Sequence, residues 1–413
     1  MNLAPQGARL NLAFTFKLFR SVVTSASKLL WLSLFQSHQF EKARSEFGEL
    51  YSALWDTAEH SISHLGFNLP SALSDGPVNS VNALLCHLYG SRYASLSFGG
   101  SSGTLLTLLI GVLPKLQPHR DLILFDDACH QSTIGGIIFG RWKAVRFPRT
   151  LDPVHQTTLP LTCTDFISIV ETHGPERFAA IVLVLPSYDG FRSPTEDRKI
   201  YAYARSKGIT VIVDGAWDAV RFRQTDPEPP ALNSICDVWI TSPHKRGLTP
   251  SSLGCILTDN REIARLWDAA LDLGFRSSSV SFVEIMIAEH RLQQIVSGDW
   301  NQAFSLAEES AKQLRDRVEE IHPDLYVVQV KDAQAEYVDP THILINTGRI
   351  IDFDARKWAE NLANNFEIDV EKATASTLLL LCASPVHAKN TTRIIRSLKE
   401  SILMTITHAS KAT

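Results

Sequence analysis

Five short apolar runs, rich in valine, isoleucine and leucine, are spread through the middle of the chain and constrain its fold more than any other feature. The runs are residues 122–125, 180–185, 210–213, 237–240 and 253–257. Segments with helical periodicity separate them, most clearly at residues 198–206. Apolar strands that alternate with helices are typical of a mainly parallel sheet with both faces covered. The sequence therefore predicts an α/β fold.

Polar side chains follow two of these runs at the points where the strands are expected to end. Asp214 comes directly after the third run, and Ser242, His244 and Lys245 all lie within five residues of the end of the fourth run. In open α/β sheets, ligands bind at the carboxyl ends of the strands. We therefore expect these four side chains to share one site.

The residue types at these strand ends suit pyridoxal 5′-phosphate. This cofactor needs an amine for a Schiff base, an anion beside its pyridine nitrogen, and hydrogen-bond donors for its phosphate. Lys245 is the candidate amine and Asp214 the candidate anion, and Ser242 and His244 are the candidate donors. Each residue alone is common on a surface or in a turn, so it is the combination that indicates the cofactor.

Two further segments carry candidate binding groups. Residues 99–104 read Gly-Gly-Ser-Ser-Gly-Thr and precede the apolar run 105–113. Small residues at a helix start expose backbone N–H groups at the positive end of the helix dipole, where phosphates bind. His130 follows the first apolar run and a turn, where an aromatic ring can stack on a planar cofactor. A histidine in such a place is also often only a hydrogen-bonded structural residue.

Length and composition set the domain organisation and the class of partner. A chain of 413 residues that is 45% apolar can bury one large core and one smaller core. We expect an N-terminal helical arm over residues 1–74, a large domain over 75–280, a helical connector over 281–324 and a small C-terminal domain over 325–413. The net charge of −4 gives no indication of nucleic-acid binding. The six cysteines are widely spaced and favour a cytoplasmic, reducing environment without a metal site.

The N-terminal segment differs from the rest of the chain. Residues 10–40 are apolar and aromatic, carry Lys17, Arg20 and Lys28, and contain no acidic residue. The longest uncharged stretch in this segment has 12 residues, which is too short for a transmembrane helix. A transit peptide and a helical arm that packs on the body or on a partner subunit both fit this pattern, and we favour the arm.

Five segments in this order resemble the ornithine/lysine/arginine decarboxylases, which are pyridoxal-phosphate enzymes with the aspartate-aminotransferase fold. They read GGSSGT, DDACHQS, LPSYDGF, IVDGAWDA and TSPHK, and the resemblance covers about residues 74–399. Residues 276–282 resemble the family segment whose hydroxyl reaches a phosphate in the neighbouring subunit. Residues 339–341, Gly348 and a strand expected at 367–371 are similar to the family's small domain. The resemblance implies fold type I, with a mainly parallel seven-stranded sheet in a large domain and a small C-terminal α/β domain.

The resemblance also implies a role for each matching residue. Lys245 would hold the cofactor as a Schiff base, Asp214 would pair with the pyridine nitrogen, and Ala216 and His130 would lie on opposite faces of the ring. The residues implied for the phosphate are Ser101, Ser102, Ser242 and His244, with Ser277 supplied by the second subunit of a homodimer. Trp217 would line the substrate cleft.

The chain departs from the family at its entrance and within three motifs. The early Pro-Gly-His-Lys segment is not found, and residues 10–40 stand in its place. The family's Asn-Gly-Thr-Ser, His-Lys-Ser and Asp-Glu-Ala or Asp-Ser-Ala are altered here at residues 99–102, 130–132 and 214–216. None of these changes removes the cofactor chemistry, so they concern which substrate is accepted.

The sequence thus predicts a pyridoxal-phosphate-dependent decarboxylase of lysine, ornithine, arginine or a modified relative. Arg349 is a candidate for gripping a substrate carboxylate, as in aminotransferases, and Asp189 and Asp218 are candidates for binding a basic side chain. The same cofactor would also serve an aminotransferase, an oxidase, or a side-chain lyase or cyclase. A non-catalytic scaffold would have no need of Lys245 with Asp214, and a nucleotide-binding protein would need a P-loop or GxGxxG motif, neither of which occurs.

Overall fold

The computed structural model describes most of the chain beyond its N-terminal segment. The described residues are 77–217, 232–246, 249, 253–271, 282–298, 301–382 and 386–412. The arm predicted over residues 1–74, and the predicted site residues Asp218 and Ser277, lie outside them. None of the helices within the described ranges is long and apolar enough to cross a membrane.

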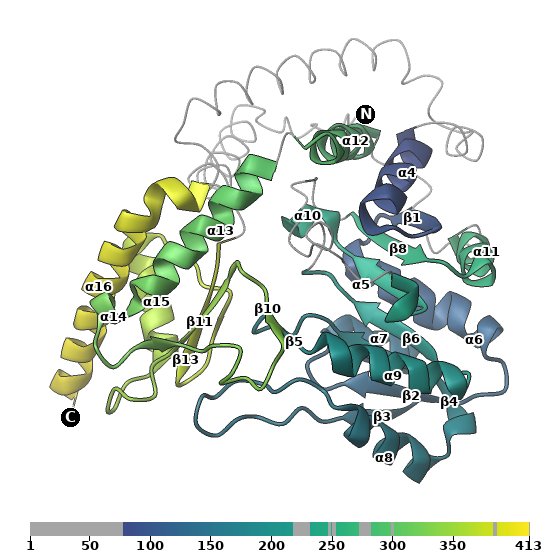
Figure 1. Cartoon of the computed structure of the whole chain (residues 1–413), viewed down its shortest axis with the longest axis horizontal. Coiled ribbons are helices and arrows are strands. Elements are labelled where there is room, and N and C mark those ends of the chain that lie inside the picture. Colours follow the sequence, from purple (N-terminus) through teal and green to yellow (C-terminus); the bar gives the residue numbers. More distant parts are fainter. Residues whose placement is uncertain are drawn as a thin grey trace, which may run out of the picture.

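A seven-stranded sheet forms the centre of the large α/β unit (Figure 1). Its strands are β1 (Tyr93–Ser97), β2 (Leu122–Asp126), β3 (Lys143–Phe147), β4 (Phe178–Val184), β6 (Thr210–Asp214), β7 (Val238–Thr241) and β8 (Gly254–Thr258). Their order is β1-β8-β7-β6-β4-β2-β3. Only β8 runs against its neighbours, and the remaining pairings are parallel. The predicted mainly parallel sheet is therefore confirmed.

The central strands β4, β6 and β7 are buried along their whole length because both faces of the sheet are covered. All seven residues of β4 are buried. Along this strand, Ile181 and Leu183 enter one hydrophobic core, whereas Ala180 and Val182 enter the core on the opposite face. Successive side chains of a strand point to opposite faces, so a continuous apolar run is what a doubly covered strand requires.

Two groups of helices supply these cores. On one face lie α4 (Pro77–Tyr89), α8 (Cys163–His173), α9 (Pro194–Ser206) and α12 (Phe282–Val296). On the other lie α5 (Gly100–Thr107), a π-helical turn (Leu108–Val112), α6 (Leu113–Leu116), α7 (Gln131–Phe139) and α11 (Arg261–Ala270). The result is a three-layered unit in which helices enclose the sheet.

A smaller antiparallel sheet lies beside the large unit (Figure 1). It consists of β12 (Lys372–Ala373), β13 (Thr377–Leu381), β11 (His342–Asn346) and β9 (Tyr326–Val327), in that order. Its core is completed by α13 (Asn301–Asp316), α14 (Val318–Ile321), α15 (Ala355–Phe366) and α16 (Val386–Ala412). A short ladder between β5 (Phe191–Arg192) and β10 (Tyr337–Val338) joins the two units. The small α/β unit agrees with the prediction, and the domain boundaries stay predictions.

The strand predicted at residues 367–371 is wrong. Helix α15 ends at Phe366, its C-cap residue Glu367 has a left-handed φ of 55°, and residues 367–370 belong to no strand. The first ladder contact is the N–H of Glu371, which donates to the carbonyl of Leu379 at 3.0 Å. Ile368 and Val370 still pack against the small core. Polar and apolar residues alternate over 367–371 because one side of the segment is buried. A segment without strand structure can bury one side in the same way.

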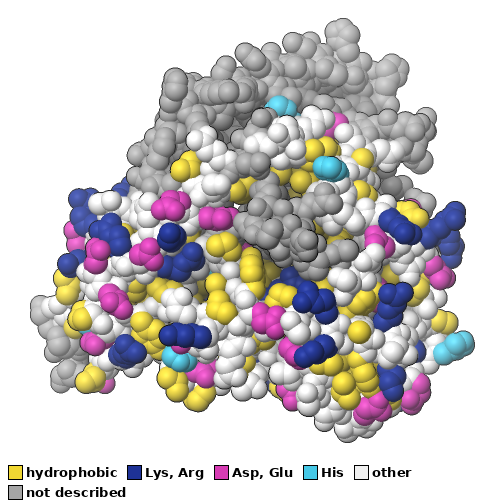
Figure 2. Space-filling model, in the orientation of Figure 1, with side chains coloured by type: hydrophobic (Ala, Val, Ile, Leu, Met, Phe, Trp, Pro, Cys, Tyr) yellow, Lys and Arg dark blue, Asp and Glu magenta, His cyan; other side chains and the backbone are white. Residues whose placement is uncertain are grey.

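Charged side chains are mixed over the visible surface. On the face shown in Figure 2, lysine and arginine side chains lie among aspartate and glutamate side chains. This distribution agrees with the small net charge of −4.

Candidate active site

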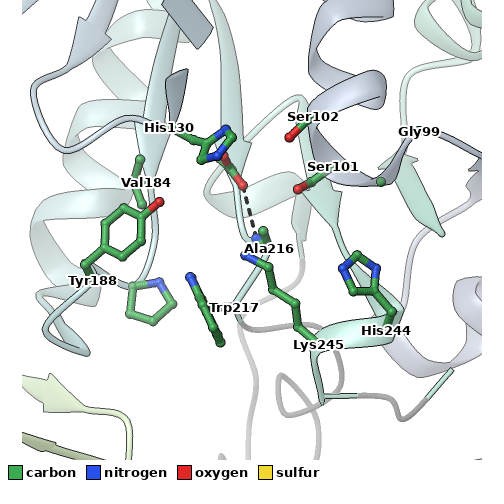
Figure 3. Close-up of a pocket in the computed structure, with 13 residues that line it drawn as sticks. Gly99, Ser101, Ser102, His130, Val184, Tyr188, Ala216, Trp217, His244 and Lys245 are labelled. Atoms are coloured by element: carbon green, nitrogen blue, oxygen red, sulfur yellow. Dashed lines mark hydrogen bonds between the residues drawn. The ribbon is translucent and has the colours of Figure 1, made fainter. Parts of the chain in front are cut away.

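A cavity of about 370 Å³ lies where the large sheet's strands end (Figure 3). Its thirteen lining residues are Gly99, Gly100, Ser101, Ser102, His130, Val184, Pro186, Tyr188, Asp214, Ala216, Trp217, His244 and Lys245. They follow the carboxyl ends of β1, β2, β4, β6 and β7. Eight of the predicted site residues thus meet in one cavity, because parallel strands end at the same edge of a sheet.

Asp214 is the last residue of β6 and is held between β4 and β7. Its side chain is buried, and its Oδ1 accepts a hydrogen bond from the N–H of Ala216 at 3.1 Å. Burial raises the pKa of Asp214 above its ordinary value, although the Ala216 N–H and the nearby Lys245 and His130 favour the carboxylate. A cationic ring nitrogen bound beside Asp214 would stabilise the ionised form.

Lys245 lies in the short helix α10 (Pro243–Arg246) that follows β7. Its side chain extends into the cavity toward Ala216 and Trp217 (Figure 3). Nζ lies 4.1 Å from the centre of the Trp217 ring, a distance at which the ring attracts a cation. The amine therefore faces the same space as the buried carboxylate of Asp214.

The start of α5 forms one end of the cavity, where the sequence predicts an anion site. Gly100 has a φ of +64°, which glycine adopts at no steric cost. The N–H of Ser101 donates to the hydroxyl of Ser242 at 3.2 Å. Gly254 of β8 lets this helix start approach the sheet, because a Cβ there would overlap the carbonyl of Gly100. Ser242 itself is buried behind the cavity wall.

His244 stands next to this helix start. Its Nδ1 lies 2.9 Å from the carbonyl oxygen of Leu253, and because a carbonyl only accepts, Nδ1 carries the proton. The second ring nitrogen is then an acceptor in neutral His244 and a donor only in the charged ring. His244 would therefore donate to a phosphate as an imidazolium.

His130 caps the N-terminus of α7 and also lines the cavity. Its Nδ1 accepts from the N–H of Ser132 at 3.2 Å and lies 2.8 Å from the Ser132 hydroxyl. An accepting Nδ1 leaves the ring proton on Nε2. The His130 ring also lies near enough to the Asp214 carboxylate to favour its ionised form, so the structural and the cofactor-facing interpretations of His130 are compatible.

A buried ion pair supports the wall behind these residues. Arg149 donates to Asp126 through Nε at 2.7 Å and through Nη2 at 2.5 Å, and both side chains are almost fully buried. Asp126 also accepts from the N–H groups of Ala128 and Val184, at 2.9 and 3.1 Å. The pair thus ties the turn before His130 to the end of β4. Sequence reasoning missed it because no motif marks Arg149.

Three lining residues were also missed, namely Val184, Pro186 and Tyr188. Val184 is the last residue of β4, whereas Pro186 and Tyr188 follow the strand in the segment Leu-Pro-Ser-Tyr-Asp-Gly-Phe that the resemblance contains, and this position was the available signal. Any polar or aromatic residue directly after a parallel strand is a candidate for the ligand-binding edge.

The altered motif at residues 214–216 has a packing explanation. A Cβ on Gly215 would overlap the indole ring of Trp239, a buried residue of β7. The large ring of Trp239 thus occupies the space that a side chain at position 215 would need.

Two further candidates lie away from the cavity lining. Arg349 is exposed, and its guanidinium carbon lies 4.3 Å from the centre of the Tyr326 ring. Asp189 is only 2% exposed and accepts from Nζ of Lys372 at 2.9 Å. Contrary to the prediction, the Asp189 carboxylate faces the small sheet rather than a substrate. The role of Arg349 stays a prediction.

Solved structures show what the chain is similar to. It is 16% identical to serine palmitoyltransferase from Sphingomonas wittichii, with 80% of this chain and 77% of that chain covered and a TM-score of 0.57. It is 16% identical to the constitutive lysine decarboxylase of E. coli, with 96% of this chain and 63% of that chain covered and a TM-score of 0.67. It is 13% identical to cystalysin from Treponema denticola, which contains a pyridoxal 5′-phosphate cofactor. In that comparison 85% of this chain and 88% of that chain are covered, and the TM-score is 0.59.

These neighbours establish the fold of the chain. Together with the seven-stranded sheet, they show the architecture called fold type I among pyridoxal-phosphate enzymes. No protein-family model matches the sequence, and no curated protein matches it. The reaction therefore has to be argued from the residues of the site.

Proposed function

We propose that this chain binds pyridoxal 5′-phosphate and uses it to transform an amino acid. The observation that carries the proposal is the meeting of Lys245, the buried carboxylate of Asp214 and the small-residue start of α5 in one cavity. When bound, the cofactor supplies an aldehyde for an amine and a ring that withdraws electrons from the substrate's Cα.

The residues of the cavity fit this cofactor at each of its parts. Nζ of Lys245 would be the amine for covalent attachment, and the carboxylate of Asp214 would accept a hydrogen bond from the protonated ring nitrogen. Ala216 and His130 are the side chains for the two ring faces. The phosphate would be held by Ser101, Ser102 and His244, at the positive end of the α5 dipole. The buried hydroxyl of Ser242, which accepts from the N–H of Ser101, would support this end from behind the cavity wall.

The finer proposal is decarboxylation of a basic amino acid. The five motifs that resemble those of the ornithine/lysine/arginine decarboxylases support it, and so does the structural likeness to the E. coli lysine decarboxylase. The aromatic rings of Tyr188 and Trp217 line the cavity and offer faces for a cationic side chain. In this reaction the substrate's Cα loses carbon dioxide and gains a proton, and Nζ of Lys245 is the group placed to donate that proton.

We also propose that the protein acts as a cytoplasmic homodimer in which Ser277 of the second subunit reaches the phosphate. Helix α7, which the cavity residue His130 caps, leaves Ile134, Ile138 and Phe139 exposed at 37%, 64% and 73%. Exposed apolar side chains on one helix beside a site favour association. A second copy that covers α7 would thereby close the cavity from that side.

Product analysis tests the proposed function. Purified protein loaded with pyridoxal 5′-phosphate is incubated with lysine, ornithine, arginine and a wider amino acid panel, and carbon dioxide, keto acid, ammonia and peroxide are followed together. Carbon dioxide with the matching amine is the expected result. Keto acid, ammonia or peroxide without carbon dioxide would assign the chain to a transaminase, lyase or oxidase reaction. Absence of saturable cofactor binding would overturn the proposal as a whole.

A further inference from the structure

The turn that carries Tyr188 joins the cavity to the small sheet. The N–H of Gly190 donates to the carbonyl of Ser187 at 2.8 Å, which makes residues 187–190 a tight turn. Gly190 has a φ of +88°, a conformation that other residues rarely adopt. Of the two central residues, Tyr188 lines the cavity and Asp189 bonds to Lys372. The turn therefore has one ligand-facing and one small-domain-facing side chain.

Asp189 is held by two other segments of the chain, residues 157–158 and Lys372. Besides Nζ of Lys372 at 2.9 Å, its carboxylate accepts from the hydroxyl of Thr157 at 3.3 Å. It also accepts from the hydroxyl and the N–H of Thr158, at 3.0 and 3.3 Å. Burial opposes the charge, but Lys372 and the bonds from Thr158 outweigh it and hold the pKa of Asp189 below its ordinary value. Asp189 is thus a buried, ionised side chain that connects the turn to Lys372 and to residues 157–158.

Backbone contacts also join the turn at residues 187–190 to the small unit. The N–H of Asp339 donates to the carbonyl of Gly190 at 2.9 Å, and a Cβ on Gly190 would come within 2.7 Å of the His342 side chain. The β5–β10 ladder continues this contact directly after the turn. Little free space is left between the turn and the small sheet, so a shift of the small sheet has to move the turn.

Tyr188 faces the cavity from the end away from the anion-binding residues. In Figure 3 it stands across the cavity from Ser101, Ser102 and His244. Burial raises the pKa of the Tyr188 phenol, with smaller contributions from Asp214 and Glu371. Glu371 directly precedes Lys372, so the start of β12 lies close to both side chains of the turn.

We propose that Lys372 is a positioning residue for the cavity: through its bond to Asp189 it fixes Tyr188, so the small domain sets one wall of the ligand site. This inference rests on the proposed function in one respect, that the ligand facing Tyr188 is pyridoxal 5′-phosphate. Lys372 touches no ligand itself, and its effect passes through the turn.

The ion pair between Lys372 and Asp189 can be broken by a single substitution at Lys372. Lys372 is 37% exposed, so Lys372→Met removes its charge without leaving a cavity in the core. Asp189 is 2% exposed and keeps its bonds from Thr157 and Thr158, but loses its only cationic partner among the described residues. A buried carboxylate without its cation is unfavourable, so the turn is expected to shift toward solvent and carry Tyr188 with it.

The first measurement is the dissociation constant of pyridoxal 5′-phosphate, obtained by absorbance titration of the full chain. Lys372→Met is expected to weaken binding about tenfold, a coupling of ordinary size for residues in one network. Lys372→Arg should restore most of the affinity because it keeps the cation. Lys357→Met removes a charge from an exposed residue of the same domain and should bind as the wild type does.

A double-variant cycle tests whether the effect passes through Tyr188. If it does, Lys372→Met should change cofactor affinity much less in a Tyr188→Ala background than in the wild type. Equal effects in the two backgrounds, or an unchanged affinity in Lys372→Met, would overturn the proposal.

Amide hydrogen exchange of residues 185–192, measured without added cofactor, keeps the two proposals separable. Lys372→Met should exchange faster here than Lys357→Met, whether or not the cofactor binds. If the wild type fails to bind pyridoxal 5′-phosphate but this segment loosens, the proposed function falls and the positioning role stands. If the exchange of Lys372→Met matches that of Lys357→Met, the positioning role is wrong.

Discussion

Nζ of Lys245 lies 4.1 Å from the centre of the Trp217 indole ring, at the carboxyl end of the central strands. A cation over an indole face is stabilised by about 0.5 to 2 kcal/mol, depending on its exposure. Trp217 follows β6 and Lys245 follows β7, so the contact exists because these two strands are neighbours in the sheet. It directs the amine into the cavity.

Lys245→Ala should abolish the visible absorbance of protein-bound pyridoxal 5′-phosphate, because no other amine lines the cavity among the described residues. Borohydride reduction followed by mass spectrometry should label residue 245 in the wild type and leave the variant unlabelled. Lys357→Ala is the matched control. If Lys245→Ala kept the same absorbance band, Lys245 would not be the attachment site.

Asp214→Asn should separate the stability of the protein from its chemistry. Burial raises the pKa of Asp214 in the folded protein, so the folded state holds its proton more tightly than the unfolded state does. Stability then falls as pH rises from the unfolded carboxyl pKa, about 3.9, through the raised folded value. Without cofactor, Asp214→Asn should therefore unfold at higher urea than the wild type at pH 7, and this advantage should shrink toward pH 4.

Turnover should move in the opposite direction. Asp214→Ala and Asp214→Asn should still bond the cofactor through Lys245, yet lose about a hundredfold or more in kcat because the ring nitrogen loses its anion. The substrate found by product analysis is the one to use. Turnover equal to that of the wild type would remove Asp214 from the proposed chemistry.

Arg149→Met should destabilise the protein by about 3 to 5 kcal/mol, the usual cost of leaving one member of a buried ion pair alone. Urea unfolding measures this loss. Arg146→Met, which breaks the exposed pair with Asp127, is the control and should be close to the wild type. Adding Asp126→Asn to Arg149→Met should recover part of the stability. A small effect of Arg149→Met would show that Asp126 finds another partner.

Gly215→Ala should cost about 1 to 3 kcal/mol, the usual range for an overpacked site, because its Cβ would overlap the buried Trp239 ring. Combining it with Trp239→Leu should make the two changes less destabilising together than their sum. If the two losses of stability were additive in thermal unfolding, the Trp239 ring would not be the reason why residue 215 is glycine.

Phe139→Asp should turn the proposed homodimer into a monomer, because it places a charge in the exposed apolar face of α7. Sedimentation equilibrium measures the change. The control is Ile351→Asp, at an 88% exposed position in the small domain, which should leave the assembly unchanged. A dimer that persists in Phe139→Asp would place the interface elsewhere.

The amino-acid sequence predicts five of the seven strands of the large sheet, all but β1 and β3, and the edge at which the site forms. Apolar runs such as residues 180–185 identify strands that are covered on both faces, since an exposed face would be polar. Parallel strands end at one edge, so residues that follow different runs, such as Asp214 and Lys245, were expected to meet, and they line one cavity. Local pattern and strand direction suffice for both inferences.

Only the tertiary structure decided which neighbours surround that site. The bonds of Arg149 to Asp126, the fit of Gly215 to Trp239 and the pairing of Asp189 with Lys372 all join residues that are distant in sequence. Each depends on strand order or on the contact between the two sheets. Spacing along the chain does not encode these relations, because a side chain after a strand can line the cavity, as Tyr188 does, or contact the small unit, as Asp189 does.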